Sequence, residues 1–67
     1  MLDVQRGYLY EAPGNVMEIR VVGVFDFGST TYVSYYYLDN GVQWKGYTRT
    51  MPEFTDFLED RGYQRKQ

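Results

Sequence analysis

The alternation of apolar and polar residues predicts strands over the first three quarters of the chain. Residues 7–11 place two tyrosines on one face and end at the turn sequence of residues 12–15. Residues 16–27 begin with apolar side chains at every second position, and the alternation stops near Gly23. A glycine inside a strand often marks a bulge or sharp bend, so we expect the longest strand to bend there.

Residues 30–39 and 42–49 form the clearest predicted hairpin, because Asn40-Gly41 between two β-favouring runs is the sequence of a type I′ turn. If Asp39 pairs with Val42, a regular ladder places Tyr37 opposite Trp44 on an uncharged face. We therefore expect that face to point into the core. The opposite face would carry five partner-binding candidates, which are Tyr32, Tyr36, Lys45, Tyr47 and Arg49.

The period changes to that of a helix at about residues 52–61. Thr50 and Glu53 have the spacing of a capping box, and Gly62 suits the left-handed position that follows a helix. Four apolar residues make a core-facing stripe at helical spacing, namely Met51, Phe54, Phe57 and Leu58. Residues 64–67 are expected to be a frayed tail.

These elements predict a single domain over residues 1–67 that is mainly β, with the strands before the helix. The expected architecture is a four-to-five-stranded antiparallel sheet, strongly bent or closed as an SH3-like barrel, with a C-terminal helix. Either a monomer or a homodimer fits so small a domain, because a second copy would bury more surface.

Composition narrows the chemistry. The chain has no Cys and no His, which removes the usual nucleophiles, general bases and transition-metal ligands, so we expect no enzyme, no metal site and no cofactor. A net charge of −2 disfavours a nonspecific nucleic-acid binder. The start of the chain, MLDVQRG, lacks a signal-peptide pattern and no apolar run could cross a bilayer, so a cytoplasmic location is predicted.

The residues support three binding hypotheses. The first is a protein partner on the face of Tyr32, Tyr36, Lys45, Tyr47 and Arg49, since Tyr and Arg are favoured at interface hot spots; the plain alternative is a solvated surface. The second is nucleic acid on the same face, assisted by cations near the C-terminus, namely Arg61, Arg65 and Lys66. The third is a basic site on a host protein that meets an acidic helix face of Glu53, Asp56 and Asp60.

Residues 7–54 also resemble a family of short uncharacterised SH3-like domains of bacteria and phages. The family pattern opens with Gly and Tyr, has a Val-rich second strand and a Val/Tyr-rich third strand, and ends with an aromatic-x-Arg that precedes a Phe. In this chain the matching segments are, in the same order, Gly7-Tyr8, residues 19–24, residues 32–37, and Tyr47-Thr48-Arg49 with Phe54. The family usually has Trp where this chain has Tyr47. The resemblance implies the fold and an origin in a phage or mobile element, so the leading expectation is a small non-catalytic modulator of a host protein.

Overall fold

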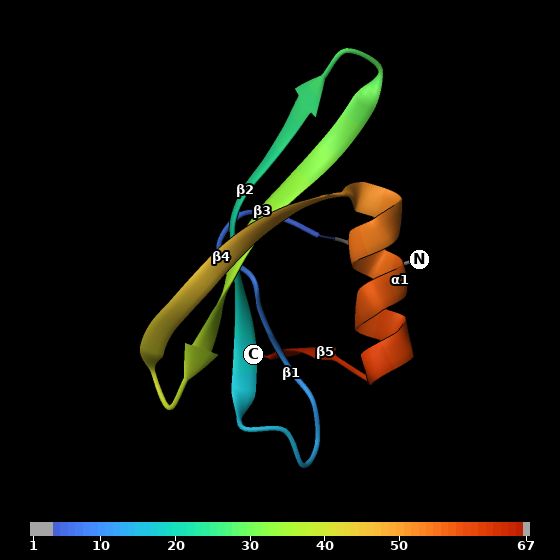
Figure 1. Cartoon of the computed structure of the whole chain (residues 1–67). Helices are drawn as coiled ribbons and strands as arrows, with labels where there is room; N and C mark the ends of the chain where they lie inside the picture. The colour runs from blue at the N-terminus through green and yellow to red at the C-terminus, as the bar shows by residue number, and fades with distance from the viewer. Residues whose placement is uncertain (1–3, 67) are drawn as a thin grey trace.

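The computed structural model describes residues 4–66 as five strands and one helix (Figure 1). The elements are β1 (Leu9–Glu11), β2 (Met17–Phe27), β3 (Thr30–Asp39), β4 (Val42–Thr50), α1 (Met51–Arg61) and β5 (Gln64–Lys66). All strand pairs are antiparallel, in the order β4-β3-β2-β1-β5. The mainly β class with a C-terminal helix is confirmed. Among the described residues β4 and β5 are the two edges of one sheet, and closure into a barrel stays a prediction.

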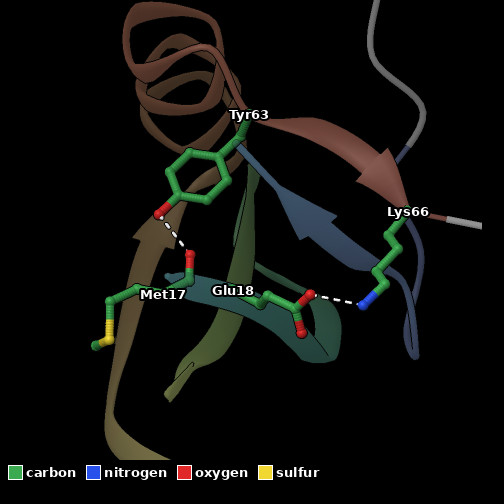
Figure 2. Close-up of polar contacts among 4 residues, drawn as sticks. All are labelled: Met17, Glu18, Tyr63 and Lys66. Atoms are coloured by element: carbon green, nitrogen blue, oxygen red, sulfur yellow. Dashed lines mark hydrogen bonds and ion pairs between the residues drawn. The ribbon is translucent and has the colours of Figure 1, made fainter. Parts of the chain in front are cut away.

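The expected frayed tail is wrong for residues 64–66, which form β5 and pair with β1. Gly62 adopts a left-handed φ of 73°, and the Tyr63 N–H bonds back to the Leu58 carbonyl at 2.8 Å, which turns the chain toward the sheet. The Tyr63 hydroxyl donates to the Met17 carbonyl at 3.1 Å, and the Lys66 ammonium lies 2.6 Å from Glu18 (Figure 2). Gln67, like residues 1–3 of the predicted N-terminal start, lies outside the described residues.

The core lies between α1 and one face of the sheet. Phe54 and Leu58 of α1 are fully buried, as the helical stripe predicts. They pack against side chains of one sheet face, chiefly Tyr10, Ile19, Val21, Val33 and Tyr35. Full burial of such a side chain contributes about 1.5–3 kcal/mol, so this small cluster supplies most of the fold's hydrophobic stabilisation.

The bulge in β2 lies next to Gly23, where the sequence predicts it. The pairing of β2 with β3 shifts between Val21 and Gly23, which leaves Val22 as the extra residue of a bulge. Val21 is therefore inward and paired with Tyr35, while Gly23 pairs with Ser34 on the outward face. Beyond this point the inward and outward positions of β2 are exchanged, since successive side chains alternate between faces.

A second bulge, in β4, was not expected. Asn40 and Gly41 have positive φ values of 51° and 84°, and Leu38 pairs with Gln43, so the predicted turn and its first pairs are confirmed. The register then shifts so that Trp44 and Lys45 together lie opposite Tyr37. The remaining predicted pairs are wrong by one residue, because Tyr47 lies opposite Tyr35, and Arg49 opposite Val33.

The β4 bulge overturns the expected facing of the aromatic residues. Trp44 was expected in the core and is instead 56% exposed. A regular ladder would have placed Gly46 against Tyr35 and left a space there. With one extra residue, the Tyr47 ring contacts the rings of Tyr35 and Tyr37, at centroid distances of 6.0 and 5.7 Å. The gain in aromatic packing accounts for the irregular register.

Candidate functional site

The five predicted partner-binding residues do not share one surface. Tyr32 and Tyr36 lie on the open face of the sheet, where Tyr32 stacks on Phe25 with ring centroids 5.6 Å apart. Tyr47 and Arg49 lie on the face that carries α1, since their strand partners are core residues. Lys45 belongs to the β4 bulge, and its ammonium lies 5.7 Å from the Tyr47 ring centroid. The prediction of a single Tyr/Lys/Arg face is therefore wrong, because one inserted residue reverses the facing of everything after it.

A shallow groove lies between α1 and β4. It is lined by residues of both elements, namely Arg49, Glu53, Asp56, Phe57, Glu59 and Asp60, and we call it the acidic groove. The stripe of Glu53, Asp56 and Asp60 was predicted as a site separate from Arg49. The β4 bulge turns Arg49 toward the helix, so the structure brings these two predicted sites together.

Arg49 is held in a fixed position within the acidic groove. Its Nε donates to the Tyr35 hydroxyl at 2.8 Å, and its guanidinium carbon lies 5.5 Å from the centroid of the Phe57 ring. Tyr35 is itself buried and packs on Phe54 at 4.8 Å. The groove floor is thus tied to the core, which limits how far its side chains can rearrange.

The helix that supplies the carboxylates is fixed at both ends. The Thr50 hydroxyl accepts from the Glu53 N–H at 3.4 Å, and the Thr50 N–H donates to the Glu53 carboxylate at 3.2 Å, so the predicted capping box is confirmed. The hydroxyl and N–H of Thr50 lower the pKa of Glu53 below its ordinary 4.5. Glu53 is therefore ionised at neutral pH.

The groove's charges do not balance. Four carboxylates and the Arg49 guanidinium line it, and Arg61 pairs with Asp60 at its edge, which leaves an excess of two negative charges. This shallow surface carries a negative potential that attracts cations and that salt screens. The arrangement suits recognition of a positively charged group.

Aromatic side chains continue from the groove along β4 and β3. Tyr47 is 42% exposed and contacts Tyr37, whose pKa is raised by burial and by the nearby hydroxyls of Tyr35, Tyr63 and Tyr47. The Tyr37 hydroxyl stays protonated at physiological pH and can donate a hydrogen bond. Trp44 is exposed on the same strand as Tyr47.

The cations of the nucleic-acid hypothesis are engaged with the protein itself. The Arg65 guanidinium carbon lies 3.8 Å from the centroid of the Tyr8 ring, and the Lys66 ammonium is bonded to Glu18. The Arg61 guanidinium lies 5.9 Å from the Phe57 centroid and 3.7 Å from Asp60. Lys66 and Arg61 each have a carboxylate beside them, which weakens their attraction for phosphate, whereas Arg65 keeps its full charge beside Tyr8.

The sequence interpretation missed an exposed apolar strip on the second half of β2. Val22, Phe25 and Phe27 are 42%, 46% and 69% exposed. Phe25 and Phe27 are two residues apart, with Asp26 between them, which is the alternation of a strand with one face in water. Once a bulge is placed before Gly23, this alternation would have identified both rings as outward.

Comparison of the chain with protein-family models, with curated proteins and with solved structures found no match. Within residues 4–66, no helix is long and apolar enough to cross a membrane. The same part of the chain has no group of three or more acidic, His or Cys residues placed to hold a metal ion. The candidate site therefore rests on the geometry and charge of the acidic groove.

Proposed function

We propose that this chain is a non-catalytic protein-binding module whose acidic groove takes a basic segment of a partner protein. The observation that carries the proposal is the gathering of Glu53, Asp56, Glu59 and Asp60 around the ring of Phe57 in one hollow. A Lys or Arg side chain of a partner would bring its charged end to the carboxylates, while its aliphatic stem takes the place beside this ring that Arg61 occupies in the free protein. Complementarity of charge between two binding surfaces favours fast and selective association.

The rigid mounting of the groove supports this proposal. Its carboxylates stand on a helix that is capped at both ends and anchored by Phe54 and Leu58. A pre-organised site loses less conformational entropy on binding than a flexible one. The exposed ring of Tyr47, two residues before Arg49 on the same face of β4, offers additional contact area beside it, of a residue type enriched at interface hot spots.

The proposed site contains two of the predicted partner-binding residues, Tyr47 and Arg49, together with the predicted acidic helix face. It leaves out Tyr32 and Tyr36, which lie on the opposite face of the sheet. A role as a phage or mobile-element modulator of a host protein stays a prediction from the sequence resemblance.

Binding to a defined basic probe tests this function. The probe is a fluorescent hexapeptide of alternating Arg and Gly, measured by anisotropy at an ionic strength of about 0.01 M, where charges act over about 30 Å. We expect saturable binding by the wild type. Asp56→Lys changes the groove by two charges and should weaken affinity at least about tenfold, which corresponds to about 1.4 kcal/mol.

Glu11→Lys is the matched control, because it makes the same charge change at an exposed position on β1. If Asp56→Lys and Glu11→Lys weaken binding equally, only net charge matters and the groove is not the site. Retention of the native circular dichroism spectrum by both variants shows that the comparison concerns folded protein.

A further inference from the structure

The second half of β2 is an open strand edge. The ladder of β1 with β2 ends at the pair of Leu9 and Arg20, and the residues just before β1 bond to Val21, whose N–H donates to the Tyr8 carbonyl and whose carbonyl accepts from the Gly7 N–H. From Val22 to Phe27, β2 has β3 on one side, and no strand of residues 4–66 on the other. In Figure 1 this end of the β2–β3 hairpin projects past α1. An exposed strand edge is a template for pairing with another chain.

The backbone groups on this edge can be identified from the pairing pattern. Both polar groups of Val21 point to β1, so Val21 and Tyr35 form a non-hydrogen-bonded pair in the β2–β3 ladder. Hydrogen-bonded and non-hydrogen-bonded pairs alternate, and the bulge is followed by the pairs Gly23–Ser34 and Val24–Val33. The N–H and C=O groups of Val24 and Asp26 therefore point toward the open side.

We propose that two copies of this chain pair through this edge as antiparallel strands related by a two-fold axis at Phe25. Residues with outward-pointing backbone groups must then face each other, so Val24 of one copy pairs with Asp26 of the other. Phe25 faces Phe25 of the second copy, and Phe27 faces its Gly23. Two five-stranded sheets become one continuous sheet.

Alternative registers of the same symmetry are worse. A shift that centres the axis on Asp26 places two carboxylates opposite each other and shortens the ladder. A shift that centres it on Val24 brings Phe27 against Val21, whose backbone groups are already bonded to Gly7 and Tyr8. The register centred on Phe25 is the longest one that meets neither obstacle.

Side chains also favour a second copy as the occupant. In this register each pair across the axis joins residues of the same sheet face. Gly23, Phe25 and Phe27 all point outward, and Val24 and Asp26 are on the other face. The phenyl ring of Phe27 would cover the partner's glycine, and each Asp26 would lie beside a valine instead of a like charge. Tyr32, stacked on Phe25, would widen the aromatic row.

Cysteine cross-linking tests the register directly, since the natural chain has no cysteine. In a non-hydrogen-bonded antiparallel pair the Cα atoms are about 4.5 Å apart, within the range of about 4.4–6.8 Å that a disulfide needs. Under mild oxidation we expect Phe25→Cys to form a covalent dimer rapidly. Val16→Cys, at a position that is 68% exposed and outside β2, should cross-link at least about tenfold more slowly. Equal rates would overturn the proposal.

Charge pairs at Phe25 give an independent test in solution. By light scattering or ultracentrifugation the wild type should approach twice its 8.0 kDa mass as its concentration rises. Phe25→Lys and Phe25→Glu should each be monomeric, because like charges meet at the axis, and an equimolar mixture of the two should dimerise. Val16→Lys should dimerise as the wild type does.

A wild type that stays monomeric at every concentration would overturn the proposal. This holds even if the edge then proves to bind an unrelated extended peptide. Dimers of Phe25→Lys alone would equally exclude this axis. If the Phe25 variants lose their native circular dichroism spectrum, Phe27→Lys, at a position that is 69% exposed, provides the decisive measurement. It should dimerise at least about tenfold more weakly, because the ring that covers Gly23 of the second copy is lost, and undiminished dimerisation would exclude pairing through this edge.

Discussion

The two halves of β2 have similar sequences and opposite surroundings. In the first half Ile19 and Val21 are completely buried between the sheet and α1. In the second half Phe25 and Phe27 are 46% and 69% exposed, although phenylalanine is as apolar as isoleucine. The hydrophobicity of a strand therefore does not decide its burial in this protein; the elements that pack on it do.

Simple lengths explain this difference. At about 3.3 Å per residue the 11 residues of β2 extend about 36 Å, whereas the 11 residues of α1 extend about 16 Å at 1.5 Å per residue. One helix of this length covers only part of so long a ribbon. The rest projects from the domain, as Figure 1 shows, and is available for association with another molecule.

The largest contrast between the two halves should come from phenylalanine truncation. Phe54→Ala removes a fully buried ring that packs on Tyr10 and Tyr35, and should lower the free energy of unfolding by about 3–5 kcal/mol. Phe27→Ala should change it by about 0.5 kcal/mol or less. Urea unfolding measures both, at a protein concentration low enough to keep the chain monomeric. Similar losses would contradict the distinction between the halves.

A smaller effect is expected from tyrosine hydroxyls. Tyr63→Phe removes the donor to the Met17 carbonyl, at the covered end of β2, and should cost about 1 kcal/mol. Tyr32→Phe, at the projecting end, is the control, and should be near neutral because the Tyr32 ring contact with Phe25 remains. If Tyr32→Phe were the more damaging change, the projecting end would be better anchored than its contacts indicate.

Alkaline pH should destabilise the covered end selectively. Burial raises the pKa of Tyr37 and Tyr63 above the ordinary 10.0. The stability that these two neutral hydroxyls contribute is therefore fully present below about pH 10, and it is lost as pH rises through their pKa in the folded protein. Glu18 likewise raises the pKa of Lys66 above 10.5. The urea midpoint should fall between pH 9 and about pH 11, and less steeply in Tyr37→Phe. An unchanged slope in Tyr37→Phe would remove Tyr37 from this account.

The smallest effect is expected at the bulge between the two halves. A Cβ added at Gly23 meets no atom within 4 Å, and its φ is not in the left-handed region, so Gly23→Ala should shift stability by about 0.5 kcal/mol or less. Gly28→Ala in the turn of the same hairpin should cost about 1–2 kcal/mol, because Gly28 has a φ of 65°. Thermal unfolding compares the two variants. A large loss at Gly23 would show that the bulge needs glycine.

Much of the fold could be predicted because its signals are local. The turn at Asn40-Gly41, the capping box of Thr50 and Glu53, and the left-handed Gly62 each depend on residues within one turn of chain. The candidate site was harder to predict. Its acidic half follows from helical spacing, but the position of Arg49 beside it depends on the bulge at Trp44 and Lys45, which begins two residues after Val42 of the turn's first pair.

By itself, the sequence determined the order, type and approximate bounds of β1 to β4 and α1, since alternation, turn conformations and helix caps are properties of neighbouring residues. Only the tertiary structure decided which faces the aromatic residues take and that the C-terminal residues form β5. The reason is competition across the sheet: packing Tyr47 against Tyr35 and Tyr37 is better than leaving Gly46 there, and that choice moves Trp44 into solvent. A difference of one residue in register has no local signal, yet it reverses every later side chain.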